Sequence, residues 1–483
     1  MSTIDDPLVQ GSFYQKRRKI FPKRVHGPFR SLKWAIMAVT LAIYYVTPWL
    51  RWDRGAFAPN QAVLVDLAHR RFYFFGVEIW PQEFYYVAGL LIMAGIGLFL
   101  ITSTVGRAWC GYSCPQTVWT DLFMAVERRI EGDRNARIKL DQAPWSAAKI
   151  AKRTAVHASW LVIGLLTGGA WVFYFADAPT LLRDLFSGQA ATVAYASVAV
   201  LTFTTYVFGG LMREQVCTYM CPWPRIQGAM LDENSLVVTY KAWRGEPRSH
   251  GTKKADIADL ELGDCVDCLA CVNVCPTGID IRNGPQLECI TCALCIDACN
   301  EVMGKLGRAP DLIGYTTPQR DVAEAAGRPL APLWRTIVRP RSLLYFAGWS
   351  SIGLAMLVVL SMRDRLDLTV SHDRNPLFVE LADGDVRNGY TVKLLNMEPR
   401  PRRIELRLEG LPGATMWQPL QESVRTRVLT VDTRPDGLEA IRVLVRAPRD
   451  LVREGSVDFR FVAREVGGTE RSIEGARFNG PEA

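Results

Sequence analysis

Twelve cysteines carry most of the recognisable chemistry in this 483-residue chain, and eight of them form two quartets with identical spacing. Each quartet reads Cys-x2-Cys-x2-Cys-x3-Cys. The quartets are Cys265, Cys268, Cys271 and Cys275, followed by Cys289, Cys292, Cys295 and Cys299. In such a run three closely spaced thiolates wrap one face of an iron–sulfur cubane, and the fourth, further along the chain, binds the other cluster. The sequence therefore predicts two [4Fe–4S] clusters.

The crossed pattern assigns four ligands to each cluster. We expect one cluster on Cys265, Cys268, Cys271 and Cys299, and the second on Cys289, Cys292, Cys295 and Cys275. Zinc is the alternative, because C-x2-C pairs also bind zinc, but two full quartets with one repeated spacing favour iron–sulfur chemistry. The repeat is similar to the bacterial two-cluster ferredoxin fold. It departs from that pattern in one place: Pro276 follows the first quartet, but Asn300 and not a proline follows the second.

The other four cysteines form two C-x3-C-P motifs, each shortly after an apolar segment. The pairs are Cys110 with Cys114, and Cys217 with Cys221. Proline favours the first position of a helix, and a helix is predicted over Thr117–Ile130. Cys114 should then lie at a helix N-terminus, where the helix dipole lowers a thiol pKa. Arg107, Arg213 and Arg225 are expected to act in the same direction.

Paired thiolates at this spacing suit soft metals, namely Cu(I), zinc or the iron of a cluster. Two thiolates that meet Cu(II) tend to reduce it and to leave a disulfide, which a low-potential cluster can reduce again. A third iron–sulfur cluster held by all four cysteines is the competing chemistry. Buried structural cysteines are the remaining interpretation, but two matched pairs favour function. The residues alone leave copper chemistry and a third cluster open.

Five apolar segments are long enough to cross a bilayer core of about 30 Å. They are Trp34–Leu50, Phe84–Val105, His157–Ala176, Ala191–Met212 and Leu343–Met362. Basic residues precede the first segment, loop 106–156 carries nine Lys or Arg, and loop 177–190 carries one. Because basic loops stay in the cytoplasm, we expect the N-terminus and the quartets inside and the C-terminal part outside.

The chain is accordingly divided into five parts. These are a basic cytoplasmic tail (1–33), a membrane domain with four spans and both C-x3-C-P motifs (34–230), a cytoplasmic ferredoxin-like domain (231–342), a fifth span (343–362) and a periplasmic domain (363–483). Short alternating runs in the last part predict a β-sandwich. The runs are Tyr390–Leu395, Arg403–Leu408, Arg425–Val431, Ala440–Val445 and Val457–Val462. We interpret this domain as a binding or assembly surface.

The strings Arg107–Val118 and Arg213–Gln227, the quartets and the β tail together resemble the CcoG/FixG/RdxI family of accessory proteins for cbb3-type cytochrome c oxidase. The resemblance implies a multi-pass protein of the bacterial cytoplasmic membrane with two [4Fe–4S] clusters and a periplasmic immunoglobulin-like domain. It also implies that the protein is a cupric reductase. Its substrate would be Cu(II), which it would reduce to Cu(I) for insertion into the oxidase. The implied catalytic and metal-binding residues are Cys110, Cys114, Cys217 and Cys221. Oxidase assembly and copper-delivery proteins are the implied partners.

Two other functions remain open at this point. One is a quinol- or donor-linked membrane electron carrier without copper chemistry, and the other is a non-catalytic assembly scaffold. Dependence of the protein's activity on copper distinguishes a cupric reductase from these two functions. The chain has no Gly-rich dinucleotide fingerprint, so its electron donor is expected to be a separate molecule of unknown identity. The membrane is an expected partner, and nucleic acid is not.

Overall fold

The computed structural model describes residues 19–249, 262–330, 332, 334–419, 425–452 and 454–482. Lys16, Arg17 and Arg18 of the predicted basic tail lie outside the described residues. The chain forms two compact units. One consists of Met1–Pro48 and Val87–Gly353, and the other of Trp49–Tyr86 and Leu354–Ala483.

Five helices are long and apolar enough to cross a membrane. They are Pro28–Trp49, Pro81–Val105, Ala147–Tyr174, Thr192–Met212 and Pro340–Met362. All five predicted segments are therefore helical. Four helices begin earlier than predicted, most clearly at Ala147, because helical hydrogen bonding continues through polar residues such as Lys149 and Lys152. Apolar content alone marks only the part of a helix without charges.

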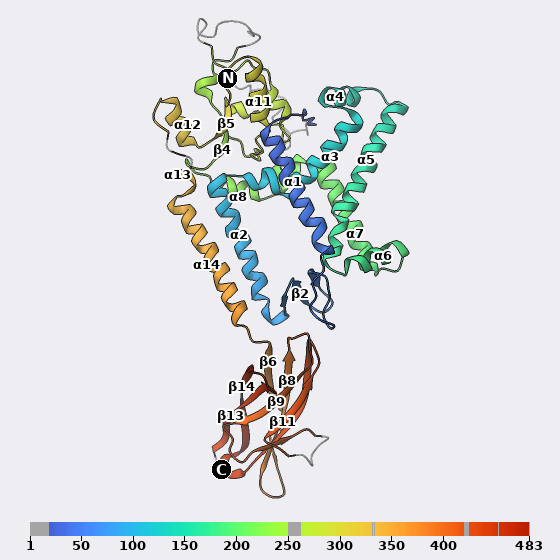
Figure 1. The fold of residues 1–483 in the computed structure, drawn as a ribbon, viewed down its shortest axis with the longest axis vertical. Coiled ribbons are helices and arrows are strands. Elements are labelled where there is room, and N and C mark those ends of the chain that lie inside the picture. The colour runs from blue at the N-terminus through green and yellow to red at the C-terminus, as the bar shows by residue number, and fades with distance from the viewer. Residues whose placement is uncertain are drawn as a thin grey trace, which may run out of the picture. The chain divides into compact units, whose positions relative to one another are not determined.

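The long helices that belong wholly or mostly to the first unit are α1 (Pro28–Val46), α2 (Tyr85–Val105), α5 (Ala147–Thr167), α7 (Thr192–Thr205) and α14 (Pro340–Met362) (Figure 1). Helices α5 and α7 pack closely at Gly164, where an added Cβ would lie 3.0 Å from the Thr202 carbonyl oxygen. Small residues allow such backbone approach between helices. Helix α14 meets α2 through the hydroxyls of Ser342 and Ser103, 3.2 Å apart.

Both C-x3-C-P motifs follow a long helix through a π-helical turn. After α2 come the π-helix η4 (Trp109–Ser113) and α3 (Pro115–Glu131). After α7 come the π-helices η6 (Tyr206–Met212) and η7 (Val216–Met220), and then α8 (Trp223–Met230). The predicted helix after Cys114 is confirmed, and its first residue is Pro115. Single π-helical turns are frequent at functional sites because they redirect side chains locally.

The quartets lie in a small α+β segment. Its helices α10 (Ala270–Val274) and α11 (Leu294–Lys305) each follow a cysteine loop, and strand β4 (Val237–Tyr240) pairs antiparallel with β5 (Ile313–Thr316). The other helices of this unit are α4 (Arg134–Gln142), α6 (Ala178–Ser187), α9 (Ala242–Gly245), α12 (Pro318–Ala325), α13 (Trp334–Ile337), η5 (Gly169–Tyr174) and η9 (Ile281–Asn283).

The start of α1 is fastened to α11 through one carboxylate. Asp297 accepts hydrogen bonds from the backbone N–H groups of Phe29, at 3.2 Å, and of Arg30, at 2.7 Å. The first N–H groups of a helix lack partners within the helix, and a negative charge there is favourable. Asp297 lies between Cys295 and Cys299, so the first long helix is attached directly to a helix that carries quartet cysteines.

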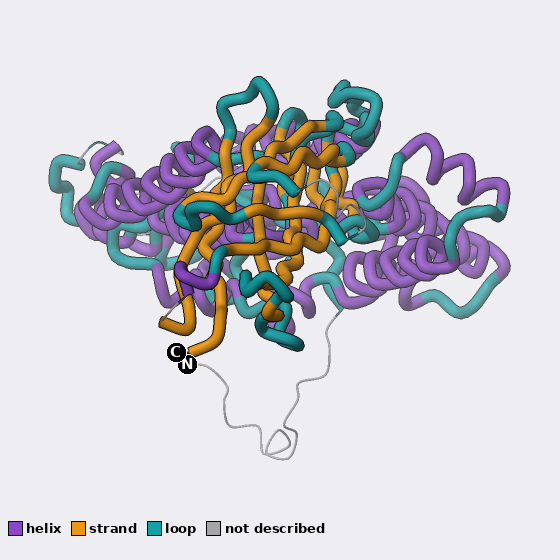
Figure 2. The backbone as a smooth tube through the Cα atoms, turned by 90° about the horizontal axis from the view of Figure 1, so that it is seen from below, coloured by secondary structure: helices purple, strands orange, loops and turns teal. Residues whose placement is uncertain are grey.

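The second unit contains two antiparallel sheets, in the strand orders β10-β12-β8-β6, with β7 on β8, and β11-β9-β13-β14. The strands are β6 (Leu366–His372), β7 (Val379–Glu380), β8 (Val386–Asn396), β9 (Arg402–Glu409), β10 (Thr415–Trp417), β11 (Val428–Thr433), β12 (Gly437–Ala447), β13 (Glu454–Glu465) and β14 (Arg471–Glu482). Most strands of the molecule gather here (Figure 2). All five predicted runs fall on strands, although β11 begins three residues later than its run, at Val428.

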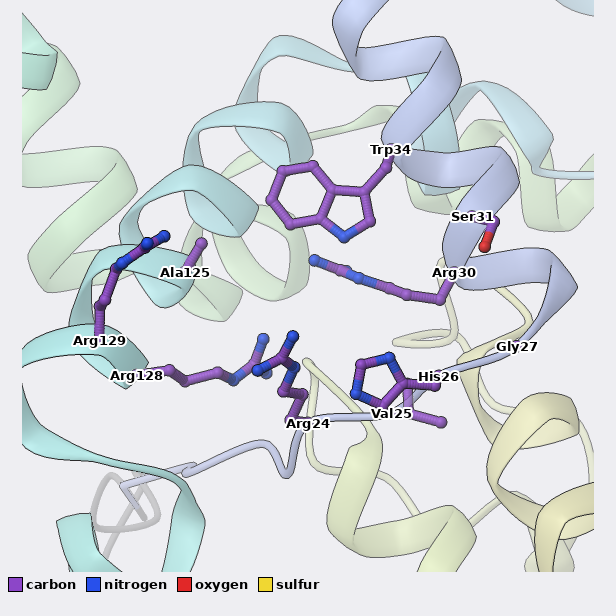
Figure 3. A pocket seen from close by; sticks show the side chains of 10 residues that line it. All are labelled: Arg24, Val25, His26, Gly27, Arg30, Ser31, Trp34, Ala125, Arg128 and Arg129. Carbon is purple, nitrogen blue, oxygen red and sulfur yellow. The ribbon is translucent and has the colours of Figure 1, made fainter.

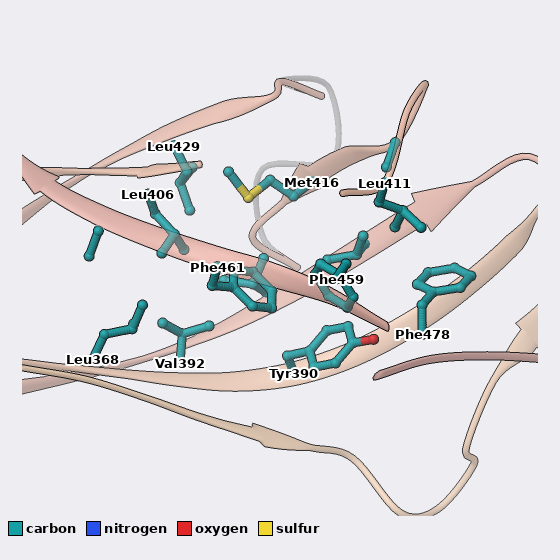
Figure 4. Packing of buried hydrophobic residues seen from close by; sticks show 14 of the residues in the cluster. Leu368, Tyr390, Val392, Leu406, Leu411, Met416, Leu429, Phe459, Phe461 and Phe478 are labelled. Carbon is teal, nitrogen blue, oxygen red and sulfur yellow. The ribbon is translucent and has the colours of Figure 1, made fainter. Parts of the chain in front are cut away.

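The core of this domain follows from the alternation along each strand. Every second residue over the first part of β8 is buried, and Tyr390 packs edge-on against Phe459 and Phe461 of the other sheet (Figure 4). Alternating burial on two facing sheets is the packing of a β-sandwich.

A three-stranded sheet, β1 (Val63–Asp66), β2 (Arg71–Phe74) and β3 (Val77–Ile79), belongs to the same unit. Arg71 of this sheet donates to the Asp436 carbonyl at 2.5 Å, and Arg363 pairs with Glu83 at 3.0 Å. The segment between the first two long helices thus packs with the C-terminal domain.

We predict that Gly27→Ala weakens the attachment of α1 to α11, because the new Cβ would overlap the side chain of Asp297. The expected loss is roughly 1–3 kcal/mol. It should appear as a lower midpoint for thermal bleaching of the visible iron–sulfur absorbance. Gly304→Ala on α11 is the matched control, since nothing lies within 4 Å of its new Cβ. Equal midpoints for the two variants would contradict the attachment.

Candidate functional site

Both cysteine loops have the same backbone conformation. Asp267 and Leu269 in the first loop have φ angles of 48° and 55°, and Thr291 and Ala293 in the second have 57° and 60°. These are left-handed conformations, which are uncommon for residues other than glycine. They occur two and four positions after the first cysteine of each quartet, so each loop curls in the same way before its helix begins. The repeated spacing therefore corresponds to a repeated structure.

Cysteines of both quartets line one small, mainly apolar cavity. Its lining includes Cys271 and Cys275 of the first quartet together with Cys289, Cys292 and Cys295 of the second. Val238, Ile279 and Ile281 contribute to its walls. The charge of Cys275 raises the pKa of Cys289, Cys292 and Cys295, so this thiol lies near all three cysteines of the second loop.

Cys299 of the second quartet lies, reciprocally, near the cysteines of the first. Burial raises the pKa of this thiol to about 12, and the neighbouring charges of Cys271, Cys268 and Cys265 act in the same direction. The four thiols therefore lie close enough to influence one another. The last cysteine of each quartet, Cys275 or Cys299, thus lies near cysteines of the other loop.

The chemistry of these groups fits iron–sulfur clusters. Burial raises the pKa of Cys292 and of Cys271 to about 12, so that both would be neutral thiols without a compensating positive charge. Cluster iron supplies that charge and holds the sulfur as thiolate. In the described part of the chain, no three His, Cys, Asp or Glu side chains are arranged around a single metal ion. The grouped thiols border an apolar cavity instead.

The four cysteines of the C-x3-C-P motifs come together at a separate site. Cys110 lies in η4, Cys114 precedes α3, Cys217 lies in η7 and Cys221 precedes α8; all four are half-buried. Burial raises the pKa of Cys110 to about 12, and the charges of the other three cysteines raise it further, against Arg107. Each of the other three sulfurs is therefore near Cys110, although they come from two distant segments.

The prediction of a lowered pKa at Cys114 is wrong. Burial raises the pKa of this thiol, and the backbone hydrogen bonds from Gln116 and Thr117 at the helix N-terminus only partly oppose the shift. Arg213 does not serve these thiols either, because its guanidinium pairs with Glu127 and lies 5.2 Å from the ring of Trp160. Desolvation outweighs the helix dipole here.

Arg107 is the basic residue that faces these thiols. It is buried, with 3% of its surface exposed, and it donates to the Leu287 carbonyl at 2.6 Å. Burial raises the pKa of Cys110, Cys217 and Cys289, and the charge of Arg107 opposes the shift at all three. Arg107 therefore lies between the C-x3-C-P site and the second quartet.

The two sites are also in backbone contact. A Cβ added to Gly111 would lie 2.7 Å from the Ile290 carbonyl oxygen and 3.0 Å from that of Thr291. Cys110 packs in the same hydrophobic cluster as Cys292 and Cys295. The C-x3-C-P site therefore lies directly against the loop of the second quartet.

Two further residues support this site without having been predicted. The Cys110 thiol donates to Oε1 of Gln227 at 3.0 Å, and Nε2 of Gln227 donates to the hydroxyl of Thr102 at 3.2 Å. Gln227 is fully buried and lies on α8, six positions after Cys221. A buried amide with both ends bonded orients the Cys110 sulfur. The only sequence signal was its place at the end of the string Arg213–Gln227.

Comparison with known proteins agrees with this architecture. Residues 87–132 match a 4Fe–4S binding domain, residues 212–318 a 4Fe–4S dicluster domain, and residues 356–481 the immunoglobulin-like fold at the C-terminus of FixG. The nitrogen fixation protein FixG of Rhizobium meliloti (strain 1021) is 58% identical over 504 residues, which cover 100% of this chain and 96% of that protein. The chain belongs to the FixG family.

Two proteins of Cereibacter sphaeroides are similarly related to this FixG-family chain. Protein RdxB is 57% identical over 87% of this chain and 90% of its own length, and protein RdxA is 51% identical over 95% and 96%. The chain is thus an oxidoreductase-like iron–sulfur electron-transfer protein, with five apolar helices and a C-terminal immunoglobulin-like domain.

We predict that Cys275→Ser and Cys299→Ser damage the clusters opposite to their own quartets. Each variant should lose about four of eight iron atoms. The reduced electron paramagnetic resonance spectrum of Cys275→Ser should match that of Cys292→Ser, and the spectrum of Cys299→Ser should match that of Cys265→Ser. A match between Cys275→Ser and Cys265→Ser would contradict the crossed assignment.

Proposed function

We propose that this protein reduces Cu(II) to Cu(I) at the C-x3-C-P site, for copper insertion during assembly of a cbb3-type cytochrome c oxidase. The observation that carries the proposal is the convergence of Cys110, Cys114, Cys217 and Cys221 against the second quartet. Thiol groups gathered at one point bind Cu(I) well because both are soft. Partners would be oxidase assembly and copper-delivery proteins, as the family resemblance implies.

The C-x3-C-P cysteines would bind copper, and the quartet cysteines would hold the clusters that supply electrons. The two groups of quartet cysteines would each hold a [4Fe–4S] cluster, which supplies single electrons when reduced by an external one-electron donor. One electron converts one Cu(II) substrate ion to Cu(I), so no proton or leaving group is required. Gln227 orients the Cys110 sulfur. The Gly111 contact keeps the path between the sites short, and Arg107 supplies positive charge along it.

A second candidate function follows from the family models. The 4Fe–4S binding domain at 87–132 includes Cys110 and Cys114, and the dicluster domain at 212–318 includes Cys217 and Cys221. Four half-buried thiols near one another also suit a third cluster. In that case the protein is a membrane electron carrier that passes electrons between three clusters, and copper is not its substrate.

The contacts within each unit support one orientation in the membrane. Residues near the N-terminus contact the quartet segment, through Lys23 and the Asn273 carbonyl at 2.7 Å and through Asp297. Four long helices separate these two parts in sequence, so an even number of crossings returns the chain to the same side. Arg71 contacts Asp436, and four long helices also separate these two residues in sequence. The same count of crossings therefore places both on one side of the membrane, opposite to the quartets. With the basic loops inside, the quartets are cytoplasmic and the immunoglobulin-like domain is periplasmic.

We predict that dithionite-reduced, cluster-loaded protein converts Cu(II) to Cu(I), measured with a Cu(I)-specific chelator after removal of excess dithionite. Serine at both Cys110 and Cys217 should abolish the reaction and leave about eight iron atoms per chain. The matched control is Thr218→Ser, a conservative change next to Cys217.

The same preparation distinguishes the second candidate. About twelve iron atoms per chain, falling to about eight in the double serine variant, would assign a third cluster to the C-x3-C-P site. Unchanged copper reduction after loss of all four thiols would contradict catalysis there.

We predict that a periplasm-dependent reporter such as alkaline phosphatase is active when fused after Ala483 and inactive when fused near residue 320. A cytoplasm-dependent fluorescent reporter should give the opposite result. Activity of one reporter at both positions would mean that α14 does not cross the membrane.

A further inference from the structure

A pocket of about 720 Å³ lies at the start of α1, and no cysteine lines it. Its walls are the segment 24–31 with Trp34, and Ala125, Arg128 and Arg129 of α3 (Figure 3). Its volume falls within the roughly 300–1,000 Å³ of small-molecule sites. No step of the proposed electron transfer uses it.

The lining is strongly basic. Arg24, Arg30, Arg128 and Arg129 supply four guanidinium groups, and His26 adds an imidazole. Figure 3 shows Arg24, Arg30 and Arg128 directed into the same space. Among the described residues, no ion pair joins a carboxylate to Arg24, Arg128 or Arg129.

Three carboxylates lie nearby, and all three are already engaged. Asp121 pairs with Arg30 at 3.2 Å and with Lys33 at 3.0 Å, Asp133 accepts the backbone N–H of Arg24 at 2.9 Å, and Asp297 accepts the backbone N–H groups of Phe29 and Arg30. The four arginines and Lys33 therefore outnumber these acids. The excess of positive charge remains at the pocket.

Arg128 indicates where an anion would bind. Its Nη2 donates to the Pro22 carbonyl at 3.2 Å, while its buried Nε has no partner among the described residues. Burial and the neighbouring charge of Arg30 lower the pKa of Arg128, and the charges of Asp121 and Asp133 oppose the shift only in part. Guanidinium groups bind phosphate oxygens in pairs with good geometry.

We propose that this pocket binds a phosphate-bearing anion. The location favours the head group of an anionic phospholipid. The pocket lies where α1, which is long enough to cross a membrane, begins, and Arg30 lies 4.6 Å from the ring of Trp34. Tryptophan is enriched at membrane interfaces, and basic pockets between membrane helices bind acidic head groups. A bound head group would join α1 to α3 beside the contact with Asp297.

The test uses the full-length protein in neutral detergent and compares two probes at constant ionic strength: short-chain phosphatidylglycerol and inorganic phosphate. The readout is the thermal midpoint of the protein, with phosphatidylcholine as the lipid control. We expect phosphatidylglycerol to raise the midpoint of the wild-type protein. In Arg24→Gln/Arg128→Gln the concentration needed should rise about tenfold or more, since each charged hydrogen bond contributes substantially. Arg183→Gln, an exposed arginine on α6, should respond as wild type.

The two probes distinguish a lipid head group from a free phosphate ion. A response to phosphatidylglycerol alone identifies a lipid site, and an equal response to inorganic phosphate identifies a site for a free anion. Arg129→Gln changes an exposed side chain and keeps the test decisive if the double variant does not fold; it should weaken binding by a smaller factor. No response of the wild-type protein to either probe, or an unchanged response in both Gln variants, overturns the proposal.

Discussion

The close approach of η4 to the loop of the second quartet is the constraint on which the arrangement of this molecule depends. Gly111 permits it, because any side chain there would meet the carbonyl oxygens of Ile290 and Thr291. Cys110, which follows α2, can then share a hydrophobic cluster with Cys292 and Cys295 of the second quartet. The attachment of α1 to Asp297 and the hydrogen bond of Arg107 to the Leu287 carbonyl hold the same two parts together.

A buried network of charges fixes α3, which carries one side of this contact. Glu127 pairs with Arg137 and Arg213, and Glu131 pairs with Arg137 at 3.3 Å and with Arg153 at 3.0 Å. Removing one partner of a buried pair leaves an uncompensated charge and costs roughly 3–5 kcal/mol. The network therefore locks α3 against α4, α5 and the end of η6. It also engages Arg213, while the charge of Arg107 acts on the thiols of Cys110 and Cys217.

Much of this architecture was predictable because it depends on local pattern. The five apolar helices, the strands of the sandwich and the helix after Cys114 follow from periodicity and from proline placement. The spacing of the quartets also predicts the crossed cluster ligation by Cys275 and Cys299. The contacts of Asp297, Gly111 and Gln227 were not predictable, since each joins segments distant in sequence and the residue types alone indicate nothing unusual.

The wrong prediction for the pKa of Cys114 shows that the desolvation of a thiol cannot be read from the sequence. A helix N-terminus can be read from proline and cysteine spacing, but the desolvation of a thiol depends on what the rest of the chain packs over it. Here burial prevails, and it raises the pKa of Cys114, of Cys217 to about 11 and of Cys110 to about 12. Such thiols are weak nucleophiles at neutral pH, and they become thiolates when a metal displaces their protons. Burial therefore keeps these thiols protonated, and the charge of Arg107 opposes this effect only in part at Cys110 and Cys217.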